Sequence, residues 1–119
     1  MTGTCVFVID AELVLRDGID PAAAGAAVTV ELCGHWNHEG PCRWPHHSAI
    51  DPERDPARFR TLFVADAAEA EAVRGRIVTA LRSATGWRLV SVFSRPVAEA
   101  ERALADRLLA GPRSTRAET

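Results

Sequence analysis

The sequence predicts an α+β fold, a two-layer sandwich in which helices pack on a mainly antiparallel sheet of about four strands. Three observations predict it. The 119 residues suit one domain, period-two alternation of apolar residues recurs along the chain, and clear helical spacing occurs only in the second half. The two helices of the C-terminal half most simply cover one face of the sheet, as in the ferredoxin-like or a related fold.

The first half of the chain predicts two strands. In residues 5–15, apolar residues alternate with a more mixed set, and Asp17-Gly18 ends the strand in a turn. Residues 28–34 alternate in the same way and predict a second strand, paired antiparallel with the first. Between them, the Ala-rich residues 21–27 fit either a single helical turn or a wide connection.

The second half predicts alternating strands and helices. Asp66 suits a helix N-cap, with Glu69 at the matching position three residues on, and Gly86 suits the end of that helix. Gly111 followed by proline ends a second helix. The predicted elements are strands at residues 59–65 and 89–93 and helices at residues 66–85 and 94–110.

The domain is expected to cover residues 1–111, followed by a flexible tail at residues 112–119. Within it, residues 33–58 are expected to form one long loop, because they lack an apolar period and residues 35–58 contain four prolines. A loop of this length is uncommon inside a compact domain and is usually functional or disordered. Any chemistry is therefore expected in this segment.

Composition narrows the class of protein. With a net charge of −2, the chain has no excess of basic residues for binding a polyanion, so no nucleic-acid partner is expected. No apolar run approaches the roughly 20 residues of a membrane span, so no membrane partner is expected either. Asp10 and Glu12 interrupt the N-terminal apolar run, which argues against a signal peptide and favours the cytoplasm. There the three cysteines would remain thiols, available for metal binding or reaction.

The Cys and His residues are strongly clustered. The chain has seven in total, and six of them fall within the fifteen residues 33–47. Thiolate and imidazole are the ligands of zinc and other late transition metals, whereas calcium and magnesium prefer oxygen. The sequence therefore predicts a metal site, zinc first. Its candidate ligands are Cys33, His35, His38, Cys42, His46 and His47, with only one of the last two expected to bind.

The metal would be either structural or catalytic. In a catalytic site, a water would complete the metal's coordination, and Glu39 would act on it as general base of a hydrolase-like enzyme. A pocket lined by Trp36, Arg43 and Trp44 would suit a planar or anionic small molecule. A metal-free alternative makes Cys42 a nucleophile, with a nearby histidine, His38 or His46, as its base.

A third hypothesis needs neither metal nor catalysis. In it, Cys33 is a buried thiol, the tryptophans anchor the loop, and the protein is a ligand-binding or dimerisation module. A homodimer would form through the sheet face away from the helices, where an uncovered apolar area usually means a partner. The residues expected to leave that area uncovered are Val6, Val8, Leu62 and Val64.

Overall fold

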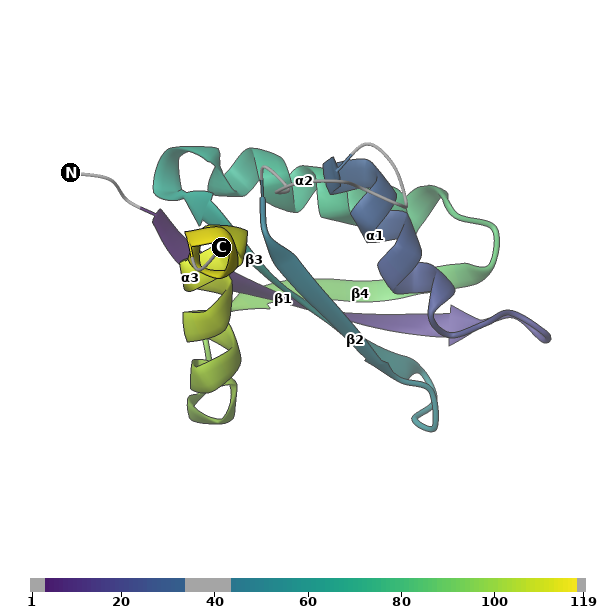
Figure 1. Cartoon of the computed structure of the whole chain (residues 1–119). Coiled ribbons are helices and arrows are strands. Elements are labelled where there is room, and N and C mark those ends of the chain that lie inside the picture. The colour runs from purple at the N-terminus through teal and green to yellow at the C-terminus, as the bar shows by residue number, and fades with distance from the viewer. Residues whose placement is uncertain (1–3, 34–43, 118–119) are drawn as a thin grey trace.

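The computed structural model describes residues 4–33 and 44–117 of the chain (Figure 1). These residues form four strands, three α-helices and one short 3₁₀ turn. In chain order the elements are β1 (Thr4–Leu15), α1 (Ala23–Cys33), β2 (His46–Asp51), β3 (Ala57–Asp66), α2 (Ala67–Ser83), β4 (Trp87–Arg95), η1 (Glu99–Glu101) and α3 (Arg102–Ala117).

The four strands form one antiparallel sheet in the order β2-β3-β1-β4. β1 lies in the middle and pairs with β3 on one side and β4 on the other. The element order β-α-β-β-α-β with this strand order is the ferredoxin-like arrangement. The predicted α+β fold with a four-stranded antiparallel sheet is therefore confirmed.

Helices cover both faces of the sheet. Alternate side chains of β1 point to opposite faces, so Ile9 and Leu13 pack with α1 and α2, whereas Val8 packs with α3. Figure 1 shows α1 and α2 together on one side of the sheet and α3 on the other, near the start of β1. The larger core lies under α1 and α2 and includes the buried aromatic residues Phe59, Phe63 and Trp87.

The strand predicted at residues 28–34 is wrong, because residues 28–33 form the second half of α1. The apolar residues at 28, 30 and 32 fit a strand, but 28 and 32 also fit one face of a helix. Val28 and Leu32 are buried with Ala24, one turn earlier, while Val30 is 45% exposed on the opposite side. The alanines before them favour helix, and together with this spacing they outweigh the short alternation.

The long loop predicted at residues 33–58 is interrupted by a strand. β2 occupies His46–Asp51 and pairs with β3, which itself begins at Ala57. The sequence did not predict β2, because its residues HHSAID show almost no alternation of apolar and polar side chains. β2 is an edge strand of the sheet. Its even-numbered residues are partly buried beneath α1, and its odd-numbered residues are exposed. Polar side chains are therefore compatible with this strand.

The last helix differs from the prediction in place and length. α2 covers the expected face beside α1, but α3 packs on the opposite face. The residues expected to leave an apolar area there are covered instead: Val8, Leu62 and Val64 are buried, and Val6 is partly buried. α3 covers Arg102–Ala117, so it begins and ends later than the helix expected at residues 94–110. Gly111 and Pro112 weaken a helix, but the surrounding Ala, Leu and Arg residues favour one.

Candidate functional site

The structure describes four of the residues nominated from the sequence. Cys33 is the last residue of α1, Trp44 precedes β2, and His46 and His47 begin β2. The connection between α1 and β2 thus starts in a helix that packs on the sheet and ends in the edge strand that this helix contacts. The remaining candidates, His35, Trp36, His38, Glu39, Cys42 and Arg43, lie outside the described residues.

His46 lies against α1. Its Nε2 atom is 3.0 Å from Oγ1 of Thr29, which is four residues before Cys33 in the helix. Gly25 permits this close approach of the helix to β2, because a Cβ atom at Gly25 would lie only 3.3 Å from Cβ of Ser48. The start of β2 and the second half of α1 are therefore held side by side.

The hydrogen bonds of His46 define which ring nitrogen carries the proton. Nδ1 lies 3.1 Å from the carbonyl oxygen of Trp44. A carbonyl oxygen only accepts, so this contact requires a proton on Nδ1. The neutral ring then has its lone pair on Nε2, where it accepts a hydrogen bond from the hydroxyl of Thr29. A metal-ligating histidine commonly has this arrangement, with the second ring nitrogen donating to a carbonyl or carboxylate.

His47 occupies a different environment. Successive residues of a strand point to opposite faces, so His47 faces away from α1 and is exposed. One ion held between α1 and β2 cannot take both histidines from this strand. This geometry is consistent with the expectation that only one of the pair would bind.

Trp44 fixes the chain just before β2 to the second helix. Its indole N–H donates to Oε1 of Glu69 at 3.4 Å, and the guanidinium carbon of Arg76 lies 5.3 Å from the ring centroid. Arg76 also pairs with Glu31 of α1 at 3.6 Å. The ring packs against the larger core. Trp44 therefore joins the start of β2 to α1 and α2, which is the anchoring role that the metal-free hypothesis expects.

Among the side chains that the structure describes, those of residues 4–32 and 44–110, no three His, Cys, Asp or Glu are arranged to hold a metal ion. His46 faces α1, and a metal ion bound at its Nε2 would replace the hydrogen bond to Thr29. Any complete site would have to draw its other ligands from Cys33 and the segment that follows it.

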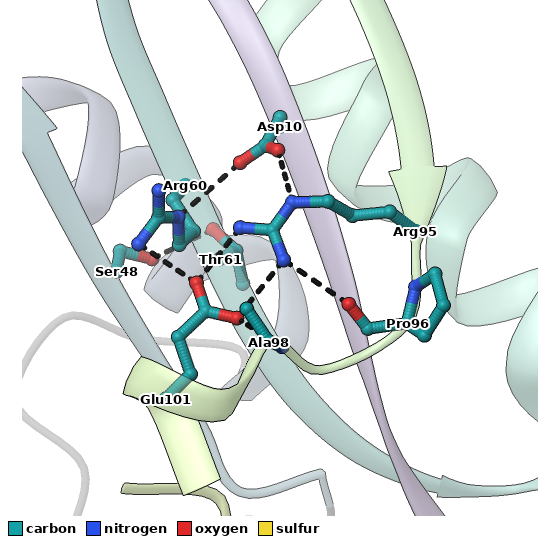
Figure 2. A network of polar contacts seen from close by, with 8 residues as sticks. All are labelled: Asp10, Ser48, Arg60, Thr61, Arg95, Pro96, Ala98 and Glu101. Carbon is teal, nitrogen blue, oxygen red and sulfur yellow. Dashed lines mark hydrogen bonds and ion pairs between the residues drawn. The ribbon is translucent and has the colours of Figure 1, made fainter.

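A second polar cluster, absent from the sequence predictions, lies on the opposite face of the sheet. Asp10 and Glu101 are buried. Figure 2 shows their carboxylates, each bound by the same two arginines. Asp10 accepts from Nε of Arg95 at 2.5 Å and from Nε of Arg60 at 3.3 Å. Glu101 pairs with Nη2 of Arg95 at 2.8 Å and with Nη1 of Arg60 at 2.7 Å. We call Asp10, Arg60, Arg95 and Glu101 the ion quartet.

The ion quartet joins the sheet to η1, the turn that leads into α3. Asp10, Arg60 and Arg95 come from three adjacent strands, and Glu101 also accepts from the backbone N–H of Ala98 at 2.9 Å. The hydrogen bonds from Arg95 lower the pKa of Glu101 from 4.5 to about 2 despite burial, which acts in the opposite direction. Two carboxylates and two guanidinium groups balance in charge, so the quartet acts as a structural clasp.

The sequence contained a signal for this cluster. Asp10 has the same parity in β1 as Val6 and Val8, so it points toward an apolar face where a lone charge is costly. Such a residue needs cationic partners, but a single sequence does not show which of the arginines pair with it. The register of the sheet supplies them: Arg60 is directly opposite Asp10 on β3, and Arg95 is opposite Val8 on β4.

Comparison with known proteins gave no match: no protein-family model matches the chain, and no curated protein is similar enough to be a relative. No helix in the described part of the chain combines the length and apolar character needed to cross a bilayer.

Proposed function

We propose that the protein binds one transition-metal ion, zinc first, through the Cys/His-rich segment 33–47. The observation that carries the proposal is the position of His46. Its Nδ1 is engaged by a carbonyl, and its Nε2 is directed at the helix that ends in Cys33. The remaining ligands would come from His35, His38 and Cys42 in the connection between these two elements.

The packing around His46 supports the proposal. A metal site needs ligands that converge, and a short segment achieves this only if its ends are held close together. Here Trp44 holds the start of β2 against α2, and the Arg76–Glu31 pair links α2 to α1. Both ends of the Cys/His-rich segment therefore lie in elements that pack against one another.

Elemental analysis of the purified native protein, before and after treatment with a strong chelator, tests the proposal. About one zinc, iron, nickel or copper per chain is expected, together with a lower melting temperature after its removal. His46→Ala should lower the metal content, whereas the neighbouring His47→Ala should not, since His47 lies on the other face of the sheet. Absence of metal, and no uptake on adding zinc, would overturn the proposal.

Replacing Glu39 with alanine distinguishes a structural metal site from a catalytic one. If the metal is structural, Glu39→Ala should leave metal content, folding and every hydrolytic activity of the protein unchanged. If the metal activates a water, the same variant should keep its metal and its melting temperature but lose turnover of a metal-dependent hydrolase substrate. We favour the structural form, because the metal would then fix the connection between α1 and β2.

We also propose a homodimer through the part of the sheet face that α3 leaves uncovered. Phe93 is 46% exposed and lies opposite Asp10, so it shares the face on which α3 packs. Light scattering after size-exclusion chromatography should give twice the chain mass of 12.9 kDa. Phe93→Ser should give the monomer, whereas Val30→Ser, an equally exposed position on α1, should not. A monomeric native protein would contradict this proposal.

The proposed location is the cytoplasm. A reducing compartment would preserve the thiolate ligands that the metal site needs. Cys5, at the start of β1, is a free and exposed thiol, which fits the same environment.

A further inference from the structure

A cavity of about 620 Å³ lies beside the first residues of β1, far along the chain from the Cys/His-rich segment. It exists because β4 is shorter than the strand beside it. The pairing of β4 with β1 ends at Arg95 and Val8, so residues 4–7 pair with β3 but have no strand on their other side within the described chain. After Arg95 the chain turns toward η1 and α3 and leaves the space open.

The inner surface of the cavity is mostly apolar. Both faces of β1 contribute to it, because the cavity wraps around the open edge of the strand. α2 forms one wall through Ala70, and the link between β4 and α3 forms the other through Pro96 and Val97. The apolar side chains of the strands that line it are Val6, Phe7, Val8, Ile9 and Phe63.

The charged groups at the cavity are mainly positive. Arg74 comes from α2, where its Nε donates to Oγ of Ser94 at 2.8 Å and its Nη1 lies 3.8 Å from Glu71. Arg102, at the start of α3, is exposed. Arg95 also lines the cavity, but its charge is compensated within the ion quartet. The two remaining arginines outweigh the single carboxylate of Glu71.

We propose that this cavity binds a small amphipathic carboxylate, a molecule with an apolar body of about ten carbons and one anionic group. The apolar body packs on Val6, Phe7 and Val97, which are partly exposed apolar side chains of the lining. The carboxylate pairs with the exposed guanidinium group of Arg102, whose planar fork suits it, and Arg74 adds positive charge at the cavity. The backbone of residues 4–7 offers hydrogen-bonding groups along the open strand edge to further polar atoms of the ligand. The site goes beyond the proposed metal function and does not depend on it.

Titration of the full chain with decanoate, followed by isothermal calorimetry and by ¹H–¹⁵N NMR, tests the proposal. Decanoate should bind at one site per chain and shift the amide signals of residues 6–9 and 70–74. Decan-1-ol, which has the same apolar body without the charge, should bind at least about fivefold more weakly, because the arginines then gain no partner. Equal binding of the two probes would overturn the assignment of a carboxylate.

Two pairs of variants locate the site. Ala70→Trp should fill the cavity and abolish binding, whereas Ala72→Trp, on the exposed side of the same helix, should not. Arg102→Ala should weaken decanoate binding about fivefold and leave decanol unchanged, whereas Arg107→Ala, exposed farther along α3, should change neither. Unchanged melting temperatures would show that all four variants fold. Binding that survives Ala70→Trp would place the ligand elsewhere and overturn the proposal.

Discussion

Asp10 is a buried carboxylate that requires cationic partners on its face of the sheet. Its side chain is 4% exposed, and it lies between arginines that are 40% and 25% exposed. A buried carboxylate without partners would be strongly destabilising, whereas partly exposed arginines can recover some hydration when they lose theirs. Within the ion quartet, the buried carboxylate of Asp10 therefore needs the arginines more than the arginines need the carboxylate.

Replacing Asp10 with Asn tests this dependence. The amide keeps the shape of the side chain but removes the charge that holds Arg60 and Arg95. We expect the free energy of unfolding to fall by about 2–3 kcal/mol, below the usual cost of breaking a fully buried pair because both arginines reach solvent. Urea unfolding measures the change. Asp106→Asn, at an exposed position of α3, is the control, and an equally small effect at both positions would contradict the prediction.

Glu101 gives the quartet a pH dependence with a definite sign. Its pKa in the folded protein, about 2, lies below the ordinary value of 4.5. The stabilisation is therefore complete above about pH 5 and is lost as the pH falls toward 2, amounting to up to about 3 kcal/mol. Wild type and Glu101→Gln should differ most in unfolding free energy above pH 5 and converge near pH 2. A difference that stays constant across this range would show that Glu101 stabilises only by packing.

At the scale of elements, α1 is where sequence and structure diverge most. A strand and a helix would both place residues 28 and 32 on one face of the element. The two structures differ in where they place residue 30. A strand would place Val28 and Val30 on the same face. The helix buries Val28 completely and leaves Val30 45% exposed. One exposed valine therefore distinguishes the two structures.

Alanine at these two positions provides the test. Val28→Ala should lower the free energy of unfolding by about 2 kcal/mol, since it removes buried methyl groups from the core. Val30→Ala should leave stability unchanged or raise it by a few tenths of a kcal/mol, because alanine favours helix more than valine does. Thermal unfolding followed by circular dichroism measures both. Equal losses at the two positions would support the strand that the alternation predicted.

The candidate site was predictable in composition but not in geometry. Clustering alone identified the segment 33–47, but Cys33, expected in a strand, is the last residue of a helix. His46 and His47 were indistinguishable in the sequence. They become distinct only because β2 pairs with β3 in one register, which directs His46 toward α1. The register depends on contacts far apart in the chain, so no local pattern contains it.

At the scale of the whole molecule, the strands with strong alternation and the helix that follows Asp66 were predicted at nearly their observed positions, although the Asp66 side chain makes no capping hydrogen bond. β1, β3, β4 and α2 all carry such local signals. The arrangement of layers was harder to predict, because both faces of the sheet are apolar near the start of β1. Val8 and Leu62 on one face require cover as much as Ile9 and Phe63 on the other. α3 supplies that cover, and the two-layer sandwich gains a partial third layer.

Ala105 tests whether this third layer is part of the cooperative fold. It is buried against Val8 and Leu62, at the centre of the contact between α3 and the sheet. Ala105→Asp would place an unpaired carboxylate there and should cost about 2–4 kcal/mol. Ala103→Asp, exposed on the same helix, should have little effect.

Limited proteolysis distinguishes two ways in which that cost could appear. If α3 detaches as a unit, trypsin should cleave Ala105→Asp after Arg107 while the sheet persists in circular dichroism. If α3 belongs to the cooperative core, the variant should instead unfold in one transition at lower urea concentration, with no early cleavage. We expect the second result, because the ion quartet ties η1 to three strands and holds the start of α3 even when its apolar contact is weakened. Early cleavage after Arg107 would show that the smaller core of Val8, Leu62 and Ala105, rather than the quartet, keeps α3 on the sheet.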